Sequence, residues 1–148
     1  PGEIKDKIDP FMESYRSNLV KLLHDPNVVG WLEATGVIEF RPLAYMRGAT
    51  FDNSLMILDE AQNADFKQLM LFITRMGKDS KVLICGDVSQ YDIAKSKVAL
   101  PDFIGLMDGI GGLGIHQFKD EDIVRNKILI QITERYEKWK STNPKHFN

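Results

Sequence analysis

The chain has little cysteine and no long hydrophobic run. Its one cysteine, Cys85, lies inside an apolar stretch, so no disulfide can form within the chain. A lone thiol also argues against a structural zinc site, which needs several Cys or His ligands. No apolar run is long enough to span a membrane and no signal peptide opens the chain. We therefore expect a cytoplasmic protein that does not bind membranes.

The chain also lacks an excess of either charge. Lys and Arg number 19 and Asp and Glu number 21, which gives a formal net charge of -2. Global electrostatics thus do not favour nucleic acid, and any such contact would need a local basic patch. The length of 148 residues and the 43% hydrophobic content fit one domain. We place it at residues 1–140, followed by a flexible tail at 141–148.

Four apolar residues, 55–58, run directly into the carboxylates of Asp59 and Glu60. Turn-forming residues precede this run, which predicts a strand buried on both faces, as in a parallel sheet covered by helices. Ligands of such sheets bind at the carboxyl ends of the strands, where one acid can hold a cation and its neighbour a water. Acids that open a helix would give the same pattern by favouring the helix dipole. This segment alone leaves both interpretations open.

A second predicted strand, 81–85, also runs into polar residues. A helix expected at 65–76, capped by Gly77, would join the two strands and bring their carboxyl ends to one edge. Arginines are candidate cations near this edge, although a helix dipole explains Arg75 and simple solvation explains Arg47. The residues placed at this edge or near it are Asp59, Glu60, Gln62, Asp87 and Gln90, with Arg47, Arg75 and Arg125.

Other segments give weaker local signals. Helices are expected to start at Asp9-Pro10 and at Asp25-Pro26, the second ending at Gly36. We also expect a strand at 37–40, a short helix at 102–107 and a C-terminal helix at 128–139. Residues 109–114 match G-x-G-x-x-G but follow a predicted helix rather than a strand, so we interpret them as a loop.

Several motifs together resemble the PhoH-like family of P-loop ATPases. They are Leu-Ala-Tyr-Met-Arg-Gly at 43–48, Ile-Leu-Asp-Glu-Ala-Gln-Asn at 57–63, Phe-Ile-Thr-Arg-Met-Gly at 72–77 and Gly-Asp-Val-Ser-Gln-Tyr-Asp at 86–92, with weaker matches at 7–11, 122–125 and 136–137. The resemblance covers nearly the whole chain. It implies an α/β P-loop NTPase fold, similar to RecA and superfamily 1 helicases, with a mainly parallel sheet flanked by helices.

The resemblance also implies a role for each matching residue. Asp59 would hold Mg²⁺ through water and Glu60 would activate the attacking water. Gln90 would sense the γ-phosphate, and Arg125 would be the candidate arginine finger. Gln62, Asp87 and Arg47 would contact the nucleotide. The implied cofactors are ATP and Mg²⁺, and the implied partners are RNA or single-stranded nucleic acid and further copies of the chain, as in a hexameric ring.

The chain departs from the family pattern in three places. Ala49 and Asn126 replace a usual arginine and a usual histidine. No G-x-x-x-x-G-K-[ST] occurs, and in the family this phosphate-binding Walker A loop and its strand lie upstream of the matched region. The predicted sheet is therefore incomplete, and we expect this chain alone to hydrolyse ATP negligibly.

Three hypotheses remain for the function. The first is the C-terminal part of a PhoH-like ATPase that couples hydrolysis to RNA or single-stranded nucleic acid. The second is a non-catalytic nucleic-acid or subunit-interaction module that retains the fold. The third is a metal-dependent nuclease built on clustered carboxylates. It ranks last because the amides of Gln62 and Gln90 suit phosphate sensing better. Its carboxylates would be Asp59, Glu60, Asp87 and Asp92.

Overall fold

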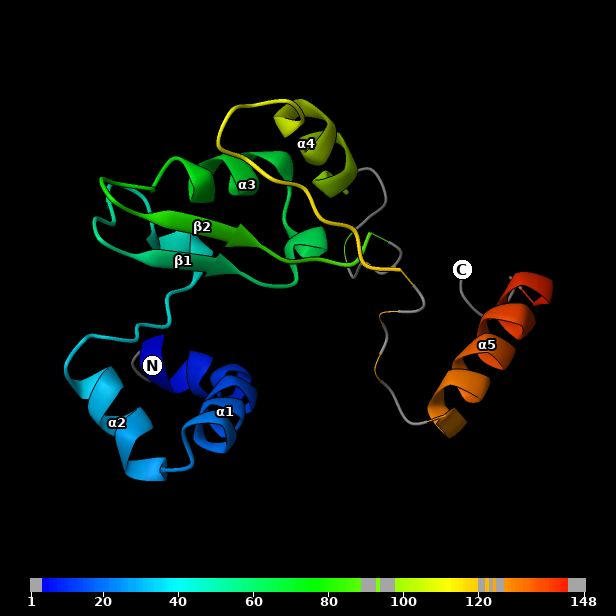
Figure 1. Cartoon of the computed structure of the whole chain (residues 1–148), viewed down its shortest axis with the longest axis horizontal. Coiled ribbons are helices and arrows are strands. Elements are labelled where there is room, and N and C mark those ends of the chain that lie inside the picture. The colour runs from blue at the N-terminus through cyan, green and yellow to red at the C-terminus, as the bar shows by residue number, and fades with distance from the viewer. Residues whose placement is uncertain are drawn as a thin grey trace. The chain divides into compact units, whose positions relative to one another are not determined.

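The computed structural model describes residues 4–88, 93, 98–119, 122, 124 and 127–143. The chain divides into two compact units, residues 1–107 and 108–148 (Figure 1). The first unit contains the motifs of the predicted sheet edge, and each unit is described by itself.

A parallel pair of strands forms the centre of the first unit. Strand β1 (Leu55–Leu58) pairs with β2 (Lys81–Ile84), and helix α3 (Phe66–Ile73) connects them. The register sets Leu58 beside Ile84, so the two strands end side by side. This confirms a mixed α/β fold with a small parallel sheet, and both predicted strands lie within one residue of their expected bounds.

Helices α3 and α4 (Leu100–Met107) lie on one face of this sheet (Figure 1). Leu69 of α3 is fully buried and packs in one cluster with Phe103 of α4, against Leu58 and Ile84 of the strands. The short helix expected at 102–107 is thus confirmed, with two more residues at its start. Packing of these apolar side chains fixes α3 directly above the strand ends.

A capping box sets the start of α3. The Asp65 carboxylate accepts from the backbone N–H of Gln68 at 2.9 Å, and the Gln68 side chain accepts from the N–H of Asp65 at 2.8 Å. These two bonds satisfy amide groups that no helical turn can satisfy. The helix therefore begins at Phe66, which leaves residues 59–65 to form the loop that carries the acids.

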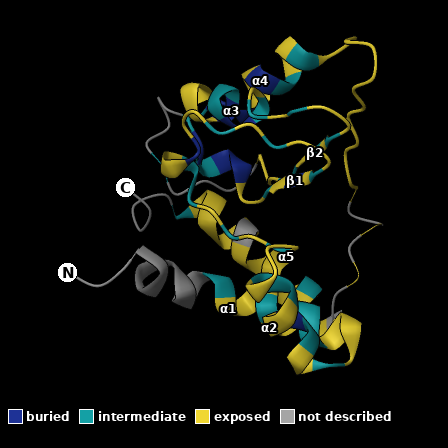
Figure 2. Ribbon diagram, turned by 90° about the vertical axis from the view of Figure 1, so that its left-hand side faces the viewer, coloured by how far each residue is buried: buried dark blue, intermediate teal, exposed yellow. Residues whose placement is uncertain are grey.

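The opposite face of the sheet is open to solvent among the described residues (Figure 2). Leu55, Ile57 and Leu83 are 64%, 57% and 49% exposed, whereas Met56 between the first two is 6% exposed. The prediction of burial on both faces is therefore wrong for this chain. The apolar run indicated a two-sided strand, but the helices that pack on it here, α3 and α4, cover one side.

Helices α1 (Ile4–Leu23) and α2 (Pro26–Ala34) pack on each other at the start of the chain. The predicted start at Asp25-Pro26 is confirmed, because the Asp25 carboxylate caps the amide of Asn27 at 2.8 Å. The predicted start at Asp9-Pro10 is wrong, because α1 already runs through these residues. An internal proline removes one helical hydrogen bond and crowds the preceding turn, yet the helix continues through it here.

The strand predicted at 37–40 does not form. The amides of Val37 and Ile38 both donate to the carbonyl of Leu32, at 2.9 and 3.1 Å, and so complete the end of α2. Gly36 has a φ of +71°, the left-handed conformation that such helix ends require. Amides that close a helix are not available to a sheet, so the apolar alternation at 37–40 was misleading.

Gly77 has a different role from the helix cap that the sequence predicted. Helix α3 ends at Ile73 with Thr74 as its cap, and Gly77 instead donates to the carbonyl of Phe51 at 2.8 Å. A Cβ at residue 77 would lie 2.7 Å from that carbonyl oxygen and 2.1 Å from a carboxylate oxygen of Asp52. The glycine therefore lets the two chain segments that enter β1 and β2 approach each other closely.

The second unit contains α5 (Lys127–Thr142), which confirms the predicted C-terminal helix. Residues 109–114 form turns, with no strand before them and no helix directly after, so their interpretation as a loop is also confirmed. Residues 144–148 of the expected tail lie outside the described residues. Within the described ranges, no helix is long and apolar enough to cross a membrane.

The close approach at Gly77 yields a stability prediction. Gly77→Ala should destabilise the chain by about 1–3 kcal/mol, because the methyl group collides with backbone atoms that cannot rotate away. The matched control is Gly105→Ala in α4, where a Cβ meets nothing within 4 Å. There alanine should stabilise by about 0.5–1 kcal/mol through its helix propensity. Urea unfolding of both variants measures the difference, and equal midpoints would refute the steric account of Gly77.

Candidate functional site

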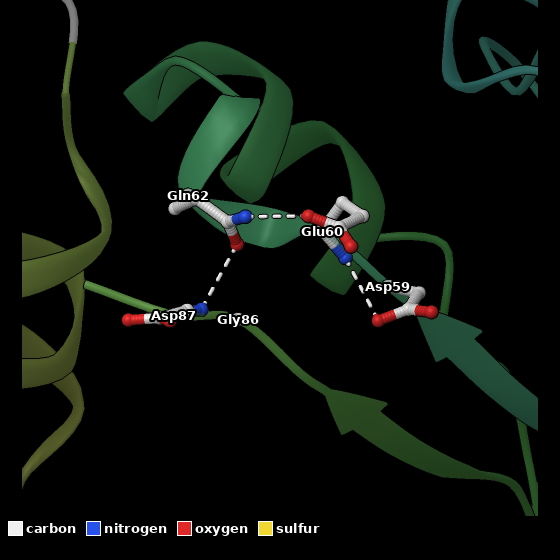
Figure 3. A pocket seen from close by; sticks show the side chains of 5 residues that line it. All are labelled: Asp59, Glu60, Gln62, Gly86 and Asp87. Atoms are coloured by element: carbon white, nitrogen blue, oxygen red, sulfur yellow. Dashed lines mark hydrogen bonds between the residues drawn. The ribbon is translucent and has the colours of Figure 1, made fainter. Parts of the chain in front are cut away.

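Each of the two strands is followed by a short segment that contains acidic residues, and both segments lie at the same edge of the sheet (Figure 3). Asp59 follows β1 directly, and Gly86 and Asp87 follow β2 after one residue. Backbone pairing continues past the strands, because the amide of Cys85 donates to Leu58 at 2.8 Å and that of Ala61 donates to Cys85 at 2.9 Å. The two polar segments are therefore held together, as the sequence predicted for a common carboxyl edge.

An open pocket of about 220 Å³ lies at this edge. Three of its lining residues carry carboxylates and one carries an amide, so oxygen donors are available at its wall (Figure 3). Hard cations and the water around them prefer such donors. The lining residues are Asp59, Glu60, Gln62, Gly86 and Asp87.

Glu60 has an uncommon backbone conformation. Its φ of 52° and ψ of 36° lie in the left-handed region, which is unfavourable for a residue with a side chain. Its amide donates to Oδ1 of Asp59 at 2.9 Å, and the 3-10 helix η2 (Ala61–Asn63) follows immediately. Strained residues of this kind concentrate at functional sites, where the surrounding structure holds them in place. Because of this turn, the side chains of Asp59 and Glu60 point in different directions, that of Glu60 toward Gln62 (Figure 3).

Gln62 joins the two strand ends through its side chain (Figure 3). Its Nε2 donates to Oε2 of Glu60 at 2.5 Å, and its Oε1 accepts from the backbone amide of Asp87 at 3.0 Å. The residue is 4% exposed and is the buried polar residue in the described core. A buried amide needs partners at both ends, and Gln62 finds them in the two segments that form the pocket.

Gly86 makes room for this bridge. A Cβ at residue 86 would lie 2.9 Å from Oε1 of Gln62 and 2.7 Å from a methyl carbon of Leu100. A side chain at this position would therefore push the amide away from the Asp87 backbone. The glycine after β2 is explained by this packing.

Tyr15 of α1 also reaches the acidic edge, a contact that sequence reasoning missed. Its hydroxyl donates to Oδ2 of Asp59 at 2.8 Å, across 44 residues of sequence. The hydrogen bond to Asp59, with burial and the nearby negative charges, raises the pKa of Tyr15 to about 12. No local pattern marks a tyrosine in a helix for a contact so distant in sequence.

Cys85, which lies in an apolar stretch of the sequence, follows β2 directly. It is half-buried, and its thiol is free. Burial, helped by the charge of Asp59, raises the pKa of this thiol. A raised pKa keeps the thiol protonated, which disfavours both nucleophilic attack and metal binding.

Of the predicted arginines, Arg47 and Arg75 do not line the pocket. Arg47 is exposed in the connector after η1 (Leu43–Tyr45). Arg75 is half-buried and donates to the carbonyl of Ala49 at 3.1 Å, so it holds the connector in place. Gln90 and Arg125 lie outside the described residues, as do Asp92 and Asn126, and their predicted roles stay predictions.

The hydrogen bond of Tyr15 yields a prediction about its ionisation. Asp59→Asn should lower the pKa of Tyr15 from about 12 toward its ordinary value near 10, because the negative charge that opposes the phenolate is removed. The hydrogen bond stabilises the fold below pH 10 and is lost as the pH rises through the folded-state pKa.

Tyrosine ¹³Cζ NMR measures this change directly. At about pH 11, Tyr15 should be mostly a phenol in the wild type and mostly a phenolate in Asp59→Asn. The control is Asp79→Asn, an acid that the left-handed backbone lets asparagine replace without strain. If Tyr15 titrates identically in all three proteins, the hydrogen bond does not exist in solution.

Comparison of the sequence with known proteins identifies the family of this chain. The model of the PhoH-like protein family matches residues 1–137. A PhoH-like protein of Bacillus subtilis is 40% identical over 139 residues, and one of Mycobacterium tuberculosis is 35% identical over 140. Protein PhoH of Escherichia coli is 34% identical over 138 residues.

These matches cover most of this chain but a smaller part of each relative. They span 93%, 94% and 92% of the chain, in the order given, and 43%, 40% and 39% of the relatives. The chain thus corresponds to about two-fifths of the length of these proteins. The family match nonetheless includes every residue of the acidic pocket, and the chain belongs to the PhoH-like protein family.

Proposed function

We propose that this chain supplies the acidic half of an ATP-hydrolysing site in a PhoH-like protein. The observation that carries the proposal is the Gln62 bridge, which joins the two strand ends and their carboxylates into one pocket. The fold proposed for the complete domain is that of P-loop NTPases similar to RecA and superfamily 1 helicases. The parallel pair β1 and β2 with its crossover helix α3 is consistent with that fold.

The donor set fits a magnesium ion that is shared with a nucleotide. The described residues contain no group of three or more His, Cys, Asp or Glu side chains that could hold a metal alone. Magnesium in phosphoryl-transfer sites takes one or two carboxylates and completes its shell with water and phosphate oxygens. Asp59 is exposed at the strand end and would be that carboxylate. Bound Mg²⁺ would neutralise negative charge on the transferred phosphoryl group.

Glu60 is the residue proposed to orient and activate the attacking water. Its carboxylate lines the pocket beside Asp59, and one of its oxygens already accepts from Gln62. The other oxygen is then the one available to a water. A carboxylate held at a fixed place can accept the proton of that water as it attacks.

Gln62 is proposed to act through Glu60 rather than on the nucleotide. Both ends of its amide are engaged within the chain, with Glu60 and with the amide of Asp87. The side chain thus couples the orientation of Glu60 to the segment that begins at Gly86. In the sequence that segment continues to Gln90, the proposed γ-phosphate sensor. A shift of the segment would move the Gln62 side chain and, through it, the Glu60 carboxylate.

The remaining roles are proposed from family resemblance. Arg125 would be the arginine finger, and Arg47 and Asp87 would contact the nucleotide. ATP hydrolysis would be coupled to RNA or single-stranded nucleic acid, within a homo-oligomer such as a hexameric ring. The net charge of -2 places any nucleic-acid contact on a local patch rather than on the whole surface.

The proposal predicts that ATP hydrolysis by a longer form of the protein depends on Glu60. In a longer form of the protein that contains a Walker A loop, Glu60→Gln should lower the ATP turnover number about a hundredfold or more, because the amide cannot accept a proton. The 148-residue chain alone should hydrolyse ATP negligibly, because no backbone loop and lysine cradle the phosphates. Phosphate release at saturating ATP measures both.

Glu134→Gln is the matched control for this experiment. It makes the same chemical change at an exposed residue of α5 that is not among the residues lining the pocket. Its turnover should equal that of the wild type. Substantial hydrolysis by the 148-residue chain, or full activity of Glu60→Gln in the longer form, would contradict the proposal.

A further inference from the structure

The carboxylate of Asp59 is held at both of its oxygens. Oδ1 accepts from the amide of Glu60 at 2.9 Å, and Oδ2 accepts from the hydroxyl of Tyr15 at 2.8 Å. One donor comes from the loop after β1 and the other from α1. A carboxylate has about four acceptor positions, so each oxygen keeps a free one for a further donor.

Tyr15 itself is supported by Phe40, in the connector after α2, and by contacts within the hairpin of α1 and α2. Its ring lies 6.3 Å from the ring of Phe40, measured between centroids, at an interplanar angle of 46°. The guanidinium of Arg16 lies 5.4 Å from the centroid of the Phe40 ring. It also forms an ion pair with Glu33 of α2 at 2.6 Å. These contacts hold the Tyr15 ring in place, so the hairpin and the connector after it together set where the hydroxyl points.

We propose that Tyr15 is a positioning residue that orients the Asp59 carboxylate for a divalent cation with its bound water. This inference rests on the proposed function, in which Asp59 holds the cation. Partners that hydrogen-bond to a metal-binding side chain fix its orientation, and their loss typically lowers metal affinity about 10- to 100-fold. The hairpin of α1 and α2 thereby becomes part of the cation site.

If the role of Tyr15 were purely structural, loss of its hydroxyl would lower the stability of the fold rather than the affinity for the cation. The side chain is 36% exposed and its bond to Asp59 lies at the surface, where such a bond adds little to fold stability. Tyr15→Phe retains the ring against Phe40 and removes only the hydroxyl. The fold should therefore persist, and the change should be confined to cation binding at Asp59.

Manganese titration of the ¹⁵N-labelled chain tests the inference without nucleotide or turnover. Paramagnetic broadening of the amide signals of Asp59, Glu60 and Gln62 locates the bound ion. Tyr15→Phe should raise the Mn²⁺ concentration for half-broadening about tenfold. Tyr45→Phe is the matched control, because it removes the hydroxyl of an exposed tyrosine on η1 and should leave the titration unchanged.

Two further variants separate the inference from the proposed function. Phe40→Leu keeps the Tyr15 hydroxyl but removes its supporting ring, and it should weaken Mn²⁺ binding less than Tyr15→Phe does. Asp59→Asn should abolish the localised broadening. If Tyr15→Phe binds Mn²⁺ as the wild type does while Asp59→Asn does not, the positioning role is overturned and the cation role of Asp59 stands. If Asp59→Asn broadens like the wild type, the inference and the proposed cation role of Asp59 both fail.

Discussion

The site depends on one buried amide that must be satisfied at both ends. Gln62 can be buried only because Glu60 accepts from its nitrogen and the Asp87 backbone donates to its oxygen. That requirement links a loop after β1 to a loop after β2. It also explains the missing side chain at Gly86, because a Cβ there would occupy the space that the amide needs. A polar contact, rather than apolar packing alone, therefore defines the pocket.

The same edge is reached from a third direction by Tyr15. Asp59 thus receives one hydrogen bond from its own loop and one from the α1–α2 hairpin, while Glu60 is fixed by its left-handed backbone and by Gln62. Two adjacent acids are held by different partners and can do different work. In a phosphoryl-transfer site one acid serves the cation and the other the water, and this division of partners suits that use.

The sequence predicted the two strands that form and their shared acidic edge, because apolar runs that end in acids reflect the topology of a parallel sheet directly. It failed at one helix end and at two places where tertiary contacts decide. The 37–40 segment alternates like a strand, yet the amides of Val37 and Ile38 complete α2 instead. Tyr15 was missed because its partner lies 44 residues away. The run at 55–58 indicated burial on two faces, but the described helices cover one.

Hydrogen exchange at the Asp87 amide in Gln62→Leu tests the central claim most directly. Leucine fills a similar volume but cannot accept a hydrogen bond, so exchange at Asp87 should accelerate about tenfold. The amide of Ala61, which donates to the Cys85 carbonyl rather than to a side chain, should stay protected and serves as the internal reference. Unchanged exchange at Asp87 would show that Gln62 does not join the two strand ends, and the account of the site would be wrong.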